Sequence, residues 1–125
     1  MTTPEIKITR VYSPREPADG VRVLVDRLWP RGLAKNLADI DEWCKDVAPS
    51  TELRRWFGHD PARFAEFSQR YRDELTEPQR VAALEHLRGL ARRGPLTLLT
   101  ATRDVTISAA VVLADLLREG TSPTR

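Results

Sequence analysis

Residues 23–32 read VLVDRLWPRG, an apolar run that changes abruptly into charge. With the two residues before it, the run becomes VRVLVD, which is nearly continuous in apolar side chains and typical of a central strand in a parallel sheet. The segment PLTLLTA at residues 95–101 has the same character. We therefore expect residues 21–26 and 96–101 to form strands that are parallel neighbours, or near neighbours, in one sheet.

Strand and helix patterns alternate along the rest of the chain. IKITRVY at residues 6–12 alternates like a strand buried mainly on one face, and DEWCKDVA at residues 41–48 suits either a short strand or an irregular helix. Helices are expected where apolar side chains recur at helical spacing: residues 51–57, 62–75, 78–92 and a closing segment after Asp104. The alternation predicts an α/β protein, a single-domain layered sandwich with a small, mainly parallel sheet flanked by helices.

Capping residues mark the start of each expected helix. Ser50 and Asp60 are positioned to cap the first two, and Asp104 to cap the last. Thr76 and Gln79 have the spacing of a capping box for the third. The second helix carries an apolar stripe that should face the interior or a partner, formed by Phe64, Phe67 and Tyr71.

Length and composition fit one small globular domain. The 125 residues are 41% hydrophobic and 30% charged, which allows one hydrophobic core and argues against a disordered chain. We expect one α/β domain over residues 1–120 and a loose tail at residues 121–125. With one cysteine, no signal-peptide pattern and no membrane-spanning run, the sequence predicts a cytoplasmic protein without membrane contact.

Polar side chains follow both central runs at the point where each strand ends. Ligands of parallel sheets bind beyond these carboxyl ends, and arginines near a helix N-terminus favour phosphate or carboxylate. The sequence therefore predicts a pocket for a small phosphorylated or carboxylated ligand. The residues expected to bind it are Arg27, Trp29, Arg31, Ser50, Trp56, Thr102 and Arg103.

An enzyme is the first alternative, since Asp26 or His59 could act as an acid or base at the same pocket. A purely structural interpretation also remains, in which Asp26 pairs with Arg103 and His59 only supports the cap at Asp60. Binding and catalysis need the same residues, so the sequence leaves both open. In either case Asp26 is expected to bond Arg27, Arg31 or Arg103.

Cofactor and metal chemistry lack their usual sequence signals. No glycine-rich nucleotide motif, phosphate loop or nucleophile elbow is present, and the cysteine and histidines are not spaced as zinc ligands. We therefore expect neither a cofactor nor a metal ion. Cys44 follows Trp43 and is expected to be a buried, inert thiol.

Two macromolecular partners are further alternatives. A nucleic-acid-binding module would use Arg54, Arg55, Arg63, Arg70 and Arg72. Acidic residues interrupt this set, at Glu52, Glu66, Asp73 and Glu74, which disfavours nucleic acid without excluding it. A homodimer is the other alternative, because RRWFGHDPARFAEF at residues 54–67 holds more aromatic side chains than one small core needs.

Three segments together resemble a known bacterial family. They read VLVDRLWPRG, DEWCKDVAPSTELRRWFGHDPARFAEFSQRY and LTLLTATRD. They are similar to the YeaO-like branch of the family grouped as domain of unknown function 488, over about residues 6–119. The resemblance implies a compact α/β sandwich in a cytoplasmic protein and implies no particular activity. An aliphatic residue is expected in the family at the position of Cys44, which weakens the case for thiol chemistry.

The family pattern and the expected site overlap. The matching positions in the first two segments are Asp26, Arg27, Trp29, Pro30, Arg31, Gly32, Pro49, Ser50, Leu53, Arg54, Trp56, Phe57, His59 and Asp60. In the third segment the match covers the last strand and the polar residues after it. Pattern and physical argument thus point to the same edge of the molecule.

Overall fold

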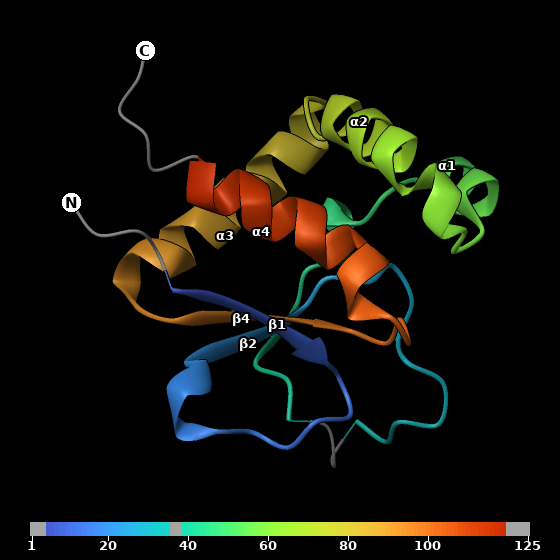
Figure 1. Ribbon diagram of the computed structural model, residues 1–125. Helices are drawn as coiled ribbons and strands as arrows, with labels where there is room; N and C mark the ends of the chain where they lie inside the picture. Colours follow the sequence, from blue (N-terminus) through green and yellow to red (C-terminus); the bar gives the residue numbers. More distant parts are fainter. Residues whose placement is uncertain (1–4, 36–38, 120–125) are drawn as a thin grey trace.

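The computed structural model of the protein describes residues 5–35 and 39–119, and its centre is a four-stranded parallel sheet (Figure 1). The strands are β1 (Ile6–Arg10), β2 (Val21–Leu24), β3 (Glu42–Trp43) and β4 (Leu96–Thr100). They lie in the order β1-β4-β2-β3. The fold is thus the predicted single-domain α/β fold. The tail expected at residues 121–125 and the helix end expected at Gly120 lie outside the described residues.

The two central strands confirm the prediction made from the apolar runs. β2 pairs in parallel with β4, with Val21 opposite Leu96 and Leu24 opposite Leu99. Every residue of β4 is buried, as expected for a strand with neighbours on both sides and cover on both faces. Because β2 and β4 are parallel neighbours, the segment that follows β4 leaves the sheet beside the segment that follows β2.

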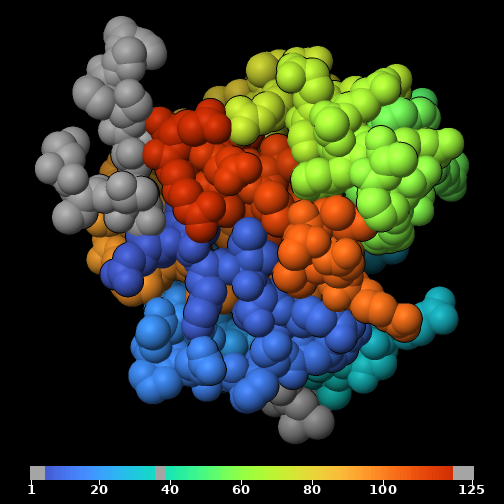
Figure 2. Space-filling model, in the orientation of Figure 1, coloured from blue at the N-terminus to red at the C-terminus, as the bar shows by residue number. Residues whose placement is uncertain are grey.

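The helices follow the predicted spans closely. They are α1 (Thr51–Phe57), α2 (Phe64–Glu74), α3 (Pro78–Arg93) and α4 (Ala109–Glu119). Figure 1 shows them on one side of the sheet, with loops on the other side. Figure 2 shows α4 (red) lying beside α2 (green) and over β1 (blue), and both pairs are in contact. The sequence predicted a sheet flanked by helices; loops take the place of helices on its second face.

Of the predicted caps, one lies directly at an α-helix, two lie at 3-10 turns that lead into α-helices, and one does not form. The Ser50 side chain accepts from the Leu53 N–H, and the Asp60 side chain accepts from the Ala62 N–H in a short 3-10 turn before α2. The predicted capping box of Thr76 and Gln79 is wrong. The Thr76 hydroxyl donates back to the Asp73 carbonyl, and α3 starts after Glu77 without a side-chain cap. The backward hydrogen bond competes with the capping geometry.

The region before α1 combines the two structures that the sequence allowed. β3 is a two-residue edge strand, and a 3-10 turn at Lys45–Val47 follows it. Asp104 likewise caps a 3-10 turn at Val105–Ile107 that precedes α4, and not α4 itself.

Inside the helix layer, Phe67 and Tyr71 are buried, and the Phe67 ring stacks on Phe57 with centroids 4.3 Å apart. The apolar stripe of α2 therefore faces the interior, as predicted.

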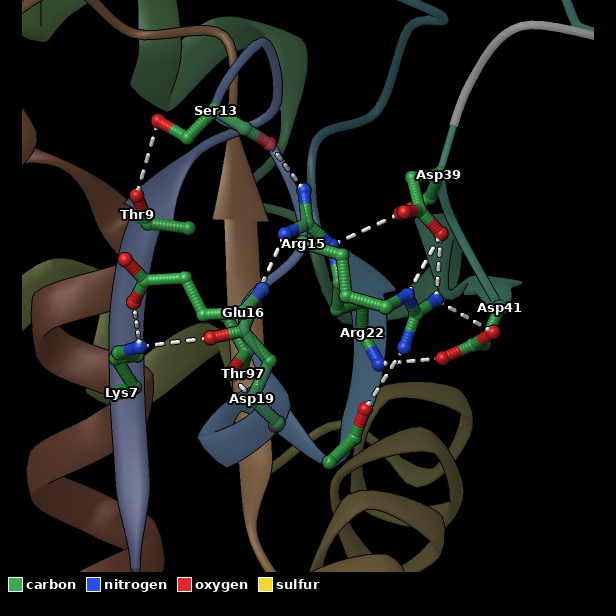
Figure 3. Close-up of polar contacts among 11 residues, drawn as sticks. Lys7, Thr9, Ser13, Arg15, Glu16, Asp19, Arg22, Asp39, Asp41 and Thr97 are labelled. Carbon is green, nitrogen blue, oxygen red and sulfur yellow. Dashed lines mark hydrogen bonds and ion pairs between the residues drawn. The ribbon is translucent and has the colours of Figure 1, made fainter.

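The loop-covered face of the sheet contains a fully buried arginine (Figure 3). Arg22 on β2 donates through Nη1 to the Asp19 carboxylate at 2.8 Å, through Nε to the Asp39 carbonyl at 2.9 Å, and through Nη2 to the Ser13 carbonyl at 2.8 Å. Lys7 on β1 donates to the second Asp19 oxygen at 2.7 Å. Every branch of the guanidinium has an acceptor, which a buried cation requires.

A second ion cluster extends this network toward the edge strand β3. Arg15 donates to the carboxylates of Asp39 and Asp41 at 2.8 and 2.9 Å. The other Asp41 oxygen accepts from the Arg22 backbone N–H at 2.8 Å. The loop after β1 and the segment before β3 are thus joined to each other and to β2 through charged side chains (Figure 3).

We predict that Asp19→Asn lowers the free energy of unfolding by about 3–5 kcal/mol at pH 7, because Arg22 then stays buried without its anionic partner. Urea denaturation followed by circular dichroism measures this change. The matched control is Glu85→Gln, which breaks an exposed ion pair with Arg88 on α3 and should cost at most about 1 kcal/mol. Equal losses in the two variants would contradict the prediction.

The same pair predicts an acid dependence of stability. Hydrogen bonds from Lys7 and from the Glu16 backbone lower the pKa of Asp19 to about 2 in the folded chain, against about 4 when unfolded. Its contribution is therefore present above about pH 4 and is lost as the pH falls through 2. The stability difference between the unmodified protein and Asp19→Asn should shrink over this interval. A difference that stays constant from pH 7 to pH 2 would contradict the assignment.

Candidate functional site

The parallel strands bring their carboxyl ends to one edge of the sheet, and a pocket of about 710 Å³ lies there. Its first wall is the loop at residues 25–31, directly after β2. Its second wall comes from α1 and the turn after it, and its third from residues 101–102 and 107–109 between β4 and α4. This volume is within the range of about 300–1,000 Å³ that is usual for small-molecule sites.

Two tryptophans hold the loop at residues 25–31 in place. Trp43 on β3 donates its indole N–H to the Asp26 carbonyl at 2.8 Å, and Trp29 donates its own to the Leu33 carbonyl at 2.7 Å. Their rings meet edge to face with centroids 5.5 Å apart. Trp29 therefore lines the pocket as a packed wall, with its only hydrogen-bond donor already used within the protein.

Asp26 joins the ends of the two central strands. One carboxylate oxygen accepts from the Thr100 hydroxyl and the other from the Ala101 N–H, both at 2.8 Å. The expected bond to Arg27, Arg31 or Arg103 is wrong: within the described chain, Asp26 forms no ion pair or hydrogen bond with any of them. Neutral donors from β4 reach the carboxylate because the two strands end side by side.

Burial raises the pKa of the Asp26 carboxyl above its ordinary value. The hydrogen bonds from Ala101 and Thr100 act in the opposite direction, as do the positive charges of Arg54 and His59. A buried carboxyl with a raised pKa in a pocket is a common feature of functional sites. Asp26 is therefore a candidate functional group of this pocket.

Three arginines line the pocket together with Asp26. Arg27 and Arg31 come from the loop after β2, and Arg54 from α1; all three line the pocket and are exposed. Within residues 5–35 and 39–119, none of the three side chains forms an ion pair or a hydrogen bond. Among the described residues of the lining, Asp26 is the only acidic one beside these three arginines, so this part of the pocket carries a net positive charge.

His59 reaches the pocket from a strained turn after α1. Its φ angle is 55°, and the preceding Gly58 has a φ of 53°, so two successive residues adopt the left-handed conformation. This conformation is uncommon for residues other than glycine. The turn places the imidazole beside Phe57, with ring centroids 6.0 Å apart, on the same wall as Arg54.

The structure brings together part of the predicted site. Arg27, Trp29, Arg31 and Thr102 line the pocket together with both acid–base candidates, Asp26 and His59. The remaining predicted residues are not part of the lining: Ser50, Trp56 and Arg103.

Each of these three residues has another environment. Ser50 caps α1 and donates its hydroxyl to Glu74, so its polar atoms are used in the fold. The Trp56 ring lies against two cations, with Arg70 at 4.3 Å and Arg63 at 5.5 Å from its centroid. Arg103 is exposed beyond the pocket wall. Spacing along the sequence did not show that these side chains point away from the strand ends.

Sequence reasoning gave several lining residues no role at this site. Arg54 was a family-pattern position and a nucleic-acid candidate but not a predicted ligand-binding residue, although it lies one helical turn before Phe57 and therefore on the same face of α1. Leu28 and Ser108 are two further examples. The i, i+3 relation to Phe57 was the available signal for Arg54, and no comparable signal exists for Ser108.

The other candidate chemistries gain little from the structure. Burial, with the nearby charges of Asp46 and Glu42, raises the pKa of the Cys44 thiol to about 11, which keeps it protonated at neutral pH. Among residues 5–35 and 39–119, no group of three histidine, cysteine or acidic side chains is placed to hold a metal ion. In the same part of the chain, no helix has the length and apolar character needed to span a membrane.

A family model and individual relatives assign the chain to the same family. A family model described as "Inactive DUF488-N3 subclade" matches residues 5–124. An uncharacterised protein of Mycobacterium tuberculosis is 52% identical over 112 residues, covering 90% of this chain and 92% of that protein. The uncharacterised protein YeaO of Escherichia coli is 44% identical over 113 residues, covering 90% and 96%.

No solved structure matches the chain significantly. The family match spans nearly the whole sequence and includes all of the pocket lining. The chain therefore belongs to the DUF488 family, in agreement with the YeaO-like resemblance of its sequence.

Proposed function

We propose that the protein binds a small anionic ligand, phosphorylated or carboxylated, in the pocket at the carboxyl ends of its strands. The observation that carries the proposal is the set of unpaired guanidinium groups on Arg27, Arg31 and Arg54. Guanidinium groups form paired hydrogen bonds with phosphate and carboxylate oxygens. A bound anion would provide the partner that each of these side chains lacks within the described residues.

Arginines elsewhere in the chain support this interpretation by contrast. Arg22 and Arg15 bond carboxylates in the network beneath the sheet, and Arg72 on α2 forms a two-bond pair with Glu119. Within the described residues, Arg55, Arg92, Arg93 and Arg103 also form no side-chain hydrogen bond or ion pair, but they lie outside the pocket lining, so what distinguishes Arg27, Arg31 and Arg54 is that they gather at one concave site. Concentrated unpaired cations around a concave site raise the local concentration of anions.

The start of α4 adds a second source of positive potential. Ser108 and Ala109 line the pocket just where α4 begins, and the helix has 11 residues. Free N–H groups at a helix N-terminus favour anions. Together with Arg54 on the opposite wall, this arrangement places anion-attracting groups on two sides of the pocket.

A binding role is favoured over catalysis at Asp26. Both carboxylate oxygens already accept hydrogen bonds from β4, which fixes the group as part of the pocket floor. The matching family model is described as an inactive subclade, which also supports binding. His59 then acts as a further polar contact for the ligand.

The macromolecular alternatives receive less support. The basic residues considered for nucleic acid are largely compensated, since Arg63, Arg70 and Arg72 pair with Asp60, Glu66 and Glu119. The aromatic side chains considered for a homodimer are Trp56, Phe57, Phe64 and Phe67. Phe67 stacks on Phe57 and on Phe64, Phe64 lies tilted beside Phe57, and the Trp56 ring lies against Arg63 and Arg70. The surplus of aromatics in this segment is therefore used within one chain.

We predict that sulfate or phosphate raises the Tm of the protein by several degrees at saturating concentration, because a ligand bound only to the folded state stabilises it by about 2.7 kcal/mol at 100 times Kd. Chloride at equal ionic strength should give a smaller shift. Arg54→Gln should abolish most of the sulfate-specific shift, as it removes one guanidinium from the pocket wall. A thermal-shift series across anions measures this.

The matched control is Arg55→Gln, on the same helix but outside the pocket lining. It should keep the full sulfate shift. If sulfate does not raise the Tm of the unmodified protein more than chloride does, the proposal is overturned. If both variants lose the sulfate-specific rise in Tm equally, sulfate acts by screening the positive charge of the whole surface, which also overturns the proposal.

Anion binding should also change the titration of Asp26. Because burial raises the pKa of this carboxyl in the folded chain, its protonated form favours folding below the unfolded value of about 4, and this advantage is lost as the pH rises through the folded pKa. A bound anion should raise the pKa further by repulsion. Carboxyl carbon NMR of the protein with and without sulfate, which keeps its charge over this range, measures both effects.

By linkage, sulfate affinity should then fall as Asp26 deprotonates. Asp26→Asn provides the control, since its sulfate affinity should lose that part of the pH dependence. An Asp26 carboxyl that titrates at the same pH in the free and sulfate-saturated protein would place the anion away from this group.

A further inference from the structure

We infer that the ligand is an organic anion with an apolar body attached to its phosphate or carboxylate, and that Leu28 makes the apolar contact. This inference rests on the proposed function and specifies the class of molecule that the pocket takes. It is carried by the size of the pocket, by the chemical division of its walls and by the exposure of Leu28.

The pocket is much larger than an inorganic anion. Its volume is about 710 Å³, whereas phosphate occupies the space of a few water molecules, each about 30 Å³ in the liquid. An anion held by Arg54 and the start of α4 would leave most of this space unfilled. A ligand that fills the site must therefore extend beyond its charged group.

The lining also contains apolar side chains. Leu28, Trp29 and Ile107 are apolar lining residues that are not fully buried. Small-molecule sites generally combine such apolar walls with a few polar groups that fix orientation. A simple inorganic anion would gain nothing from these walls, whereas an attached ring or alkyl chain would be desolvated by them.

Leu28 is the most exposed large hydrophobic side chain of the described residues, at 63% of its full accessibility. It lies on the pocket loop between Arg27 and Trp29. Two other exposed hydrophobic side chains form hydrogen bonds with this loop: Tyr12 donates its hydroxyl to the Arg31 carbonyl, and Trp43 donates its indole N–H to the Asp26 carbonyl. Leu28 thus adds exposed apolar surface to the pocket lining.

Position and chemistry together define the ligand class. The guanidinium of Arg27 and the side chain of Leu28 follow each other along one loop, so a ligand can meet a cation and an apolar surface at the same wall. Partial burial of a leucine side chain by a ligand corresponds to about a tenfold gain in affinity. The site should thus prefer an aryl or alkyl phosphate over one without an apolar body.

Isothermal titration calorimetry with methyl phosphate and phenyl phosphate tests this directly, because the two probes carry the same anionic group and differ in the apolar body. We expect phenyl phosphate to bind about tenfold more tightly. Leu28→Ser should reduce this preference to nearly equal affinities, whereas Leu28→Met, which keeps an apolar side chain, should retain most of it. Because Leu28 is exposed, these substitutions should fold normally, which a thermal melt checks.

Val81→Ser is the matched control, since Val81 is also an exposed hydrophobic residue, at 39%, but lies on α3 outside the pocket lining. It should leave the affinity for both probes unchanged. Equal affinity of the unmodified protein for the two phosphates, or a preference that survives Leu28→Ser, would overturn the inference while leaving anion binding intact. Failure of both probes to bind would instead overturn the proposed function, and this inference with it.

Discussion

The guanidinium of Arg22, buried at the centre of the sheet, determines how the loop-covered face of the molecule is built. The opposite face is apolar and is covered by helices, which is the usual way to bury a parallel sheet. A charge placed on the second face cannot be covered in that way, because desolvating it without acceptors would cost several kcal/mol. The two loops that cover it therefore supply a carboxylate from Asp19 and main-chain carbonyls from Ser13 and Asp39.

This constraint extends from the buried arginine to the pocket. Asp19 is followed by Gly20, whose φ of 64° and close approach to Pro95 leave no room for a side chain: a Cβ there would lie 2.1 Å from the Pro95 carbonyl oxygen. The glycine thus lets the chain enter β2 directly beside β4. On the other side, Asp41 and Arg15 hold the segment that leads into β3, where Trp43 bonds the Asp26 carbonyl. The pocket loop is therefore held by contacts that begin beneath the sheet.

The parts of the fold that depend on periodicity could be predicted from the sequence, and the parts that depend on individual polar contacts could not. The apolar runs of β2 and β4 and the helical stripe of α2 follow from spacing alone. Arg22 stands within an apolar run, VRVLV, which predicts a buried strand. That pattern does not predict the ion network that Arg22 forms with Asp19 and Lys7. Asp26 was expected to bond an arginine because arginines are close to it in the sequence. Its carboxylate instead accepts hydrogen bonds from the Thr100 hydroxyl and the Ala101 N–H at the end of β4.

The contrast between paired and unpaired arginines connects the fold to its function. Where the sequence needs arginine for structure, as at Arg22, the chain provides acceptors at hydrogen-bond distance from several elements. At the strand ends it gathers Arg27, Arg31 and Arg54 around one carboxyl that already bonds neutral donors. Like charges around a cavity repel one another and weaken the folded state, and natural proteins depart from internal consistency in this way mainly at functional sites. The carboxyl among them is held in place by hydrogen bonds from the Thr100 hydroxyl and the Ala101 N–H. Under the proposed function, a bound anion supplies the charge compensation at this edge, and the apolar lining residues with exposed Leu28 suit an anion that is part of a larger molecule.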